Sequence, residues 1–153
     1  MKQQLIITSL LILIGHGLGM ILDLYNVWPW FDAPMHILGG FWVATIIIAF
    51  SHKIPGLAFI NVSATQNPRP KTTFLVTLLI IVSLTMFVGL VWEFYEYGLD
   101  NLNPYSVNLN NKADIMADLF FDFVGAAIAG TAFLTGRRRL NSSSIRESGQ
   151  LTR

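Results

Sequence analysis

The stretch TTFLVTLLIIVSLTMFVGLVWEFYEYGLD, residues 72–100, decides the fold class of this chain. No charged or proline residue precedes Trp92 in it, as is typical of a helix that crosses a membrane. The stretch then ends in three carboxylates, Glu93, Glu96 and Asp100, spaced three and four residues apart. This spacing places the three side chains on one face of a helix. The sequence therefore predicts a transmembrane helix with an acidic end. The negative charge at that end needs a group that compensates it.

The composition of the whole chain indicates a polytopic membrane protein. Of the 153 residues, 53% are hydrophobic and only 12% are charged, and the mean hydropathy is +0.54. Soluble domains carry about twice that share of charged residues. The sequence contains no cysteine, which excludes disulfides and thiolate metal sites.

Four apolar segments are long enough to cross a bilayer. We predict an all-α, four-helix transmembrane bundle over residues 1–135, with helices at about 5–24, 33–50, 73–97 and 114–135. Asp32 is expected to cap the second helix, with Pro34 in its first turn. Residues 136–153 are basic and polar, so we expect a disordered cytoplasmic tail. A cleaved signal peptide is the alternative interpretation of the first segment, although that segment lacks a small-x-small cleavage site.

The charges are divided unequally between the two sides that four helices create. Nine of ten basic residues lie at the N-terminus, in the loop after the second helix or in the tail, with Lys112 as the exception. Eight of nine acidic residues lie on the other side. The positive-inside rule therefore predicts that both termini are cytoplasmic. We interpret the three consecutive arginines at residues 137–139 as a topology anchor and expect no nucleic-acid partner.

Each predicted helix carries polar residues at helical spacing, and each of these stripes continues into small residues. Small residues mark the places where transmembrane helices approach closely, so the stripes are expected to face the interior of the bundle. They also meet at one depth on the outer side, where His16, about 10 Å deeper than Asp23, would form the floor of an outward-facing pocket. The stripes contain His16, Asp32, His36, Glu93, Glu96, Asp114, Asp118 and Asp122.

A charge count favours a cation site in this outer half. It contains eight carboxylates and one lysine, so bound cations, shared protons or a water-filled vestibule must compensate the charge. A single carboxylate at mid-bilayer costs about 2.5–3.5 kcal/mol even on the mild insertion scale. Imidazole and carboxylate ligands suit Zn²⁺, Mn²⁺ or Fe²⁺. The candidate ligands are His16, His36, Glu93, Glu96, Asp118 and Asp122, with Asp32 and Asp114 in supporting roles.

Structural interpretations of the same residues stay open. His16 could be a packing histidine among glycines, and Asp23 and Asp114 could be solvated groups at helix ends. Glu93 and Glu96 could point into interfacial water. The aromatic residues near the outer boundary, Tyr25 among them, are typical of an interfacial belt.

Four ordered blocks, HGLGM, FDAPMHILGG, WEFYEY and ADIMADLFFDFVGAAIAG, resemble signature blocks of the YjdF-like bacterial inner-membrane proteins over about residues 15–130. The chain is less similar to VanZ-like membrane proteins, which share the histidine at the start of the second helix and the acidic last helix. The resemblance implies the bacterial cytoplasmic (inner) membrane but no particular reaction. Asp122 departs from the small or amide residue of that pattern. The signature positions that it implies are His16, Asp32, His36, Glu93, Glu96, Asp114 and Asp118.

Three functions follow from these observations as hypotheses. The first is a metal-dependent hydrolase of an envelope or lipid substrate, with Glu93, Glu96 and Asp118 as catalytic residues. The second is a small cation- or proton-coupled transporter, although the inner halves of the last three helices lack ionisable residues. The third is a non-catalytic membrane assembly or regulatory factor, in which the polar residues only stabilise the bundle. The sequence leaves the substrate, the metal and the oligomeric state open.

Overall fold

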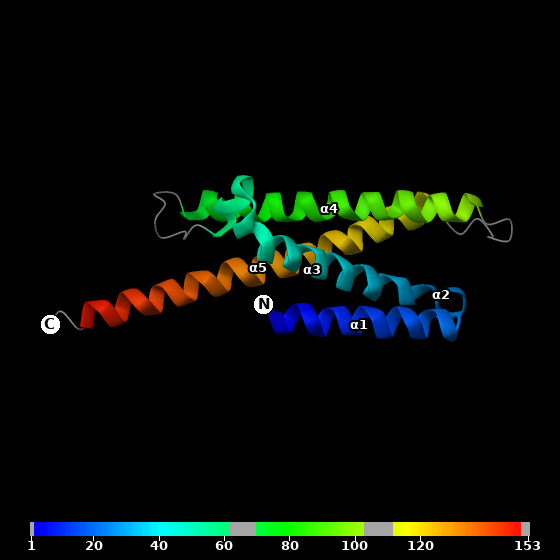
Figure 1. Ribbon diagram of the computed structural model, residues 1–153, viewed down its shortest axis with the longest axis horizontal. Coiled ribbons are helices and arrows are strands. Elements are labelled where there is room, and N and C mark those ends of the chain that lie inside the picture. The colour runs from blue at the N-terminus through cyan, green and yellow to red at the C-terminus, as the bar shows by residue number, and fades with distance from the viewer. Residues whose placement is uncertain (1, 62–69, 103–111, 151–153) are drawn as a thin grey trace.

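The computed structural model describes residues 2–61, 70–102 and 112–150, and all regular structure within these ranges is helical. Four of the helices are long and apolar enough to cross a membrane, which confirms the predicted all-α, four-helix class. They are α1 (Lys2–Ile21), α3 (Asp32–Phe50), α4 (Pro70–Leu102) and α5 (Lys112–Gln150) (Figure 1).

The first helix ends three residues before its predicted end because the chain turns at Asp23. This residue has a left-handed backbone, with φ 54° and ψ 34°, a conformation that Asp and Asn adopt more readily than most residues. Its side-chain Oδ1 accepts a hydrogen bond of 2.7 Å from Asn26 Nδ2. The turn leads into the short helices α2 (Leu24–Val27) and η1 (Pro29–Phe31), which connect α1 to α3.

The prediction that Asp32 caps the second helix is wrong. Helix α3 begins at Asp32 itself, Phe31 occupies the N-cap position, and no side-chain capping hydrogen bond forms there. The reason is that η1 runs directly into α3, so the backbone of Asp32 is already helical, with φ −68° and ψ −43°. Its carboxylate is therefore available to a residue one turn further along α3.

Helices α3 and α5 cross near their middles and form the centre of the structure (Figure 1). Helix α4 packs against both, whereas α1 lies along α3. The close crossing depends on two glycines: a Cβ at Gly40 would clash with the Asp122 carbonyl, and one at Gly125 would clash with the Ile37 carbonyl. The core consists mainly of small and β-branched side chains: Ala44, Ile48, Ile60, Ile81, Val82, Ala126 and Ala129.

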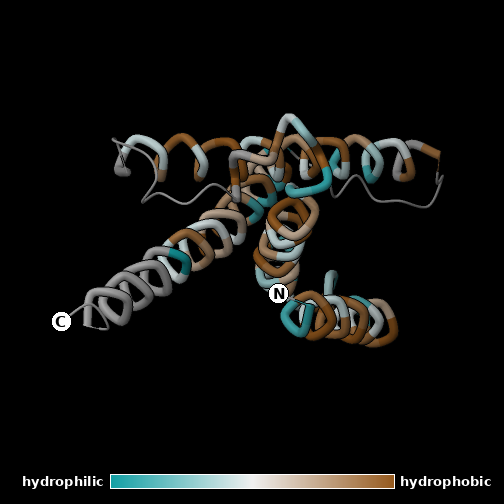
Figure 2. The backbone as a smooth tube through the Cα atoms, turned by 60° about the vertical axis from the view of Figure 1, so that its left-hand side comes forward, coloured by the Kyte–Doolittle hydropathy of each residue, from teal (hydrophilic) through white to brown (hydrophobic). Residues whose placement is uncertain are grey.

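Apolar residues recur along the described part of all four long helices (Figure 2). Many large apolar side chains are exposed, especially on α1, where Leu13 is 70% and Ile21 is 80% exposed. In a membrane such surfaces face lipid. Helix α1 is joined to α3 by a hydrogen bond of 2.7 Å from Trp42 Nε1 to Ser9 Oγ, the kind of polar contact that holds transmembrane helices together.

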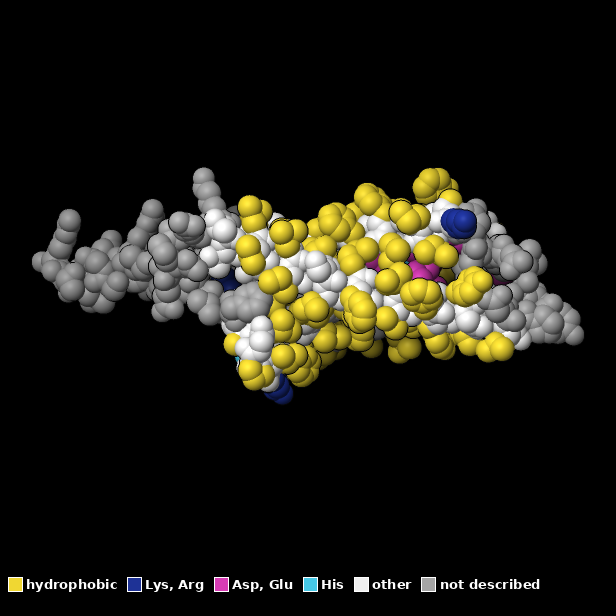
Figure 3. Space-filling view, turned by 90° about the horizontal axis from the view of Figure 1, so that it is seen from above, with side chains coloured by type: hydrophobic (Ala, Val, Ile, Leu, Met, Phe, Trp, Pro, Cys, Tyr) yellow, Lys and Arg dark blue, Asp and Glu magenta, His cyan; other side chains and the backbone are white. Residues whose placement is uncertain are grey.

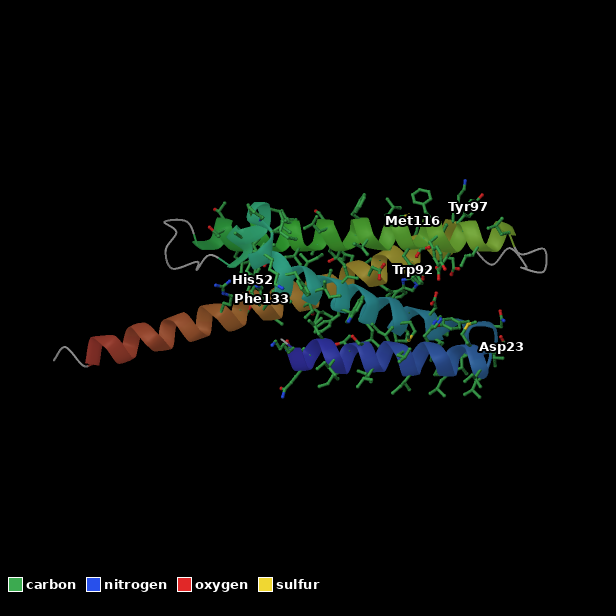
Figure 4. The ribbon with its side chains drawn as sticks, in the orientation of Figure 1. Asp23, His52, Trp92, Tyr97, Met116 and Phe133 are labelled. Atoms are coloured by element: carbon green, nitrogen blue, oxygen red, sulfur yellow. The ribbon has the colours of Figure 1, made fainter. Side chains whose placement is uncertain are left out.

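The loop after α3 packs against the bundle at the end opposite Asp23. It forms the short helices η2 (Ser51–Lys53) and η3 (Pro55–Asn61), and Ile60 is fully buried. Arg137 Nη1 donates a hydrogen bond of 3.2 Å to the carbonyl of Ile60. Figure 4 shows His52 and Phe133 toward this end, and Asp23 and Tyr97 toward the other. The two ends thus agree with the predicted topology, while the assignment of one of them to the cytoplasm stays a prediction.

The last helix extends beyond its predicted end. The sequence prediction ended it at residue 135 and expected a disordered tail, but α5 continues to Gln150. No proline interrupts residues 136–150, and each of the two glycines there costs a helix only about 1 kcal/mol, so the backbone hydrogen bonds can continue.

Candidate metal centre

Three helices bring six of the eight predicted polar side chains together. Their spacing along each helix, three or four residues, gives each pair a common face. Oxygen- and nitrogen-bearing side chains gather near Trp92, where the three helices meet (Figure 4). The six residues are Asp32 and His36 on α3, Glu93 and Glu96 on α4, and Asp118 and Asp122 on α5.

The His36 imidazole lies at the centre of this cluster. Its Nε2 is 3.6 Å from Asp32 Oδ1 and 3.7 Å from Asp118 Oδ1. Its Nδ1 is 3.5 Å from Asp122 Oδ1. The ion pairs that the structure shows for Asp32, Asp118 and Asp122 thus all converge on one ring. Even a protonated imidazole balances only one of these three negative charges.

Two groups of potential ligands share His36. The first is Asp32, His36 and Asp118, and the second is His36, Glu93 and Glu96; within each group the ligand atoms lie within 4.8 Å of one another. Ligands about 2.0–2.2 Å from a tetrahedral zinc ion are separated from each other by about 3.3–3.6 Å. The separations of 3.6 and 3.7 Å at Nε2 are close to this value and longer than those of direct hydrogen bonds. The donor set and its spacing therefore fit a divalent cation.

Burial increases from one edge of the cluster to the other. The Asp32 side chain is 34% exposed, whereas those of His36 and Asp118 are 10% and 8% exposed. Seen from above, acidic side chains are visible among apolar ones toward one end of the molecule (Figure 3). The cluster therefore reaches the surface through its less buried members and is enclosed at its centre.

Glu93 is the most deeply buried carboxylate of the cluster. The residue is 4% exposed, and its Oε1 is buried without a hydrogen-bond partner. A buried carboxylate oxygen that lacks a partner is costly, because it has lost its hydration without a replacement. Glu93 belongs to the group with His36 and Glu96, so a cation bound by this group could compensate its negative charge.

The structure does not bring the other two predicted residues into either ligand group. His16 is exposed on α1, and its Nδ1 lies 2.9 Å from the hydroxyl of Tyr25. Asp114 is exposed in the first turn of α5, where a carboxylate stabilises the helix N-terminus. Asp122 belongs to the cluster through His36 Nδ1 but to neither ligand group among the described residues.

Tyr25 is a neighbour of the cluster that the sequence interpretation placed in the aromatic belt. Besides its contact with His16, its ring packs edge-on against Phe31, with centroids 5.3 Å apart. Burial, together with the charges of Asp32 and Glu96, raises the pKa of its phenol. The turn at Asp23 reverses the chain and brings Tyr25 back over Gly19, and the sequence signals such a turn only weakly.

The family comparison agrees with this architecture. A family model described as "Predicted membrane protein (DUF2238)" matches residues 1–139. The chain belongs to this family. The DUF2238 match contains all four spanning helices and the whole His, Asp and Glu cluster. The resemblance to YjdF-like and VanZ-like proteins is not confirmed by it, and no curated protein or solved structure matches the chain.

Proposed function

We propose that this multi-pass membrane protein binds a divalent cation through His36, Glu93, Glu96 and Asp118, with Asp32 at the more exposed edge. The observation that carries the proposal is the buried, unpartnered Oε1 of Glu93 beside the His36 imidazole. Several carboxylates share this apolar surrounding with one imidazole. A divalent cation compensates their charge with less desolvation cost than leaving them unpaired.

The ligand types restrict the choice of cation. An imidazole nitrogen among carboxylate oxygens favours Zn²⁺, Mn²⁺ or Fe²⁺ over Mg²⁺ and Ca²⁺, which prefer oxygen ligands. Four protein ligands leave two positions for water and substrate on a six-coordinate ion such as Mn²⁺ or Fe²⁺.

Hydrolysis of an envelope or lipid substrate is the reaction that this site would support. A bound divalent cation supplies Lewis acidity for hydrolysis. A carboxylate of the cluster that does not ligate the cation, such as the more exposed Asp32, can accept a proton from the attacking water as general base. Glu93 and Asp118 hold negative charge at the buried side of the site. The surrounding apolar side chains suit a substrate that enters from the lipid phase.

Metal content tests the binding step. Full-length protein purified in detergent is incubated with Zn²⁺, Mn²⁺ or Fe²⁺, dialysed, and analysed for metal. We expect the native protein to retain metal and His36→Gln and Glu93→Gln to lose it. His52→Gln and Asp114→Asn are matched controls, because His52 lies at the other end of the molecule and Asp114 lies outside both groups, and they should retain it. Failure of the native protein to retain any of the three metals overturns the proposal.

A transporter is less well supported by the described helices. Ions crossing the bundle need polar groups beyond the cluster, toward the opposite end. The buried hydroxyls of Thr45 and Thr85 donate to carbonyls of their own helices, Phe41 at 2.8 Å and Ile81 at 2.9 Å. These hydroxyls are thus committed to the backbone. A flux assay in liposomes separates the two functions, since a metal-dependent hydrolase moves no cation.

A further inference from the structure

Asp122 lies on the opposite edge of the His36 ring from Asp32 and Asp118. Its Oδ1 is 3.5 Å from Nδ1, whereas Asp32 and Asp118 are next to Nε2. The lone pairs of the two ring nitrogens point in divergent directions, so an ion bound in line with Nε2 cannot also lie in line with Nδ1. Asp122 therefore faces Nδ1 of this histidine, whereas Asp32 and Asp118 face the nitrogen that an ion in line with Nε2 would use.

The carboxylate of Asp122 is held at the crossing of three helices. The residue is 6% exposed, and its backbone lies against Gly40. A Cβ added at Gly89 of α4 would lie 2.5 Å from Asp122 Oδ2, and one added at Gly39 of α3 would lie 3.7 Å from Oδ1. The absence of side chains at these glycines leaves room for the carboxylate on both sides. Packing thus directs it toward Nδ1.

We propose that Asp122 is a positioning residue, which accepts a hydrogen bond from Nδ1–H of His36 and thereby presents an unprotonated Nε2 to the cation. The proposal rests on the proposed function, because it takes Nε2 as the metal ligand. A carboxylate that holds the second nitrogen of a ligating histidine fixes both the tautomer and the ring orientation. It also assigns Gly89 a role, since the absence of a side chain at this glycine leaves room for the Asp122 carboxylate.

Two measurements on full-length protein in detergent test the assignment. The first is ¹⁵N NMR of protein labelled at histidine, recorded where the imidazoles are neutral. The chain has three histidines, so His16→Gln and His52→Gln identify the His36 signals by elimination. We expect the Nδ1–H tautomer at His36 in the native protein and loss of this preference in Asp122→Asn. The second is Zn²⁺ affinity, which should fall about 10- to 100-fold in Asp122→Asn.

Gly89→Ala provides a second variant that leaves every ligand and Asp122 itself in place. Its methyl group displaces the carboxylate, so the tautomer preference and the Zn²⁺ affinity should change in the same direction as in Asp122→Asn. Gly98→Ala on the same helix is the matched control, because a Cβ there meets nothing within 4 Å, and both readouts should stay native.

The outcomes separate this inference from the proposed function. An Nε2–H tautomer in the native protein, or a native tautomer and affinity in both Asp122→Asn and Gly89→Ala, overturns the positioning role. If the native protein binds no Zn²⁺, the proposed function fails. The tautomer measurement on metal-free protein then still decides whether Asp122 orients His36.

Discussion

The Nδ1 atom of His16 lies 2.9 Å from the hydroxyl oxygen of Tyr25, which joins α1 to the connection that follows it. The two rings meet edge-on, with centroids 5.8 Å apart. The contact gives His16 a structural partner and separates it from the cluster around His36. The structure thus supports the packing interpretation of His16, although the sequence also made it a candidate ligand.

Replacing Tyr25 with Phe should lower the free energy of unfolding by about 1 kcal/mol, the net contribution of one hydrogen bond. His16→Gln should cost a similar amount, and the double variant should cost less than the sum because the two residues share one interaction. Equilibrium unfolding of the four proteins in mixed micelles measures this cycle. All four should retain the same amount of metal, and loss of metal from Tyr25→Phe would show that the phenol belongs to the centre.

The phenol of Tyr25 should report the charge of the cluster. Its pKa is raised by burial and then by Asp32 and Glu96, so folding favours the neutral phenol. The stability that Tyr25 contributes is therefore fully present below about pH 10, the unfolded pKa, and is lost as the pH rises through the folded pKa. Bound Zn²⁺ offsets the negative charges and should lower this pKa, as should Glu96→Gln. Phenolate absorbance, taken as native minus Tyr25→Phe, measures the shift, and an unchanged pKa with saturating Zn²⁺ would argue against cation binding here.

Glu93→Gln should change stability in opposite directions with and without metal. In chelator, the neutral amide avoids the cost of a buried unpaired carboxylate, so the variant should be more stable than the native protein by about 1–3 kcal/mol. At Zn²⁺ a hundredfold above its dissociation constant, the native protein should gain about 2.7 kcal/mol and the variant little. Asp114→Asn serves as the control and should follow the native protein. A chelator-treated Glu93→Gln less stable than the native protein would mean that Glu93 has a structural partner instead.

The close crossing of α3 and α5 predicts an effect on stability that does not involve metal. Gly40→Ala and Gly125→Ala each place a methyl group against a backbone carbonyl of the other helix, which no side-chain rotation can relieve. Each should destabilise the protein by about 3 kcal/mol or prevent folding. Gly17→Ala meets nothing within 4 Å in α1 and should be neutral or stabilising, because alanine favours helix by about 1 kcal/mol. Equal effects at all three sites would contradict the close crossing.

The four helices were predictable because the length and uninterrupted hydrophobicity of each span are properties of the local sequence. The turn at Asp23 was not, since a left-handed backbone at one residue depends on the contacts that follow it. The continuation of α5 to Gln150 was missed because polar composition was taken as a sign of disorder.

The clustering of the polar side chains was predictable to the extent that helical spacing determines which side chains share a face. This reasoning placed His36, Glu93 and Asp118 correctly on facing stripes. It could not predict how the helices are arranged around one another. Helix α1 packs along α3, whereas α4 and α5 pack against each other and against α3, so the stripe of His16 does not join the other three. The roles of Asp32 and Asp122 likewise depend on which ring nitrogen each one faces.

The shared position of His36 predicts one cation per chain. The two ligand groups have only this imidazole in common, and a histidine bridges two metals only if it loses both ring protons. With Asp122 holding Nδ1, a single ion can use Nε2 and takes its carboxylates from both groups. Metal analysis at saturation should therefore give one Zn²⁺ per chain. Asp32→Asn and Glu96→Gln should each weaken binding without abolishing it, because both residues are only partly buried, whereas His36→Gln and Glu93→Gln should abolish it. Two equivalents of Zn²⁺ in the native protein, both lost in His36→Gln, would show a bridged pair of ions and refute the single site.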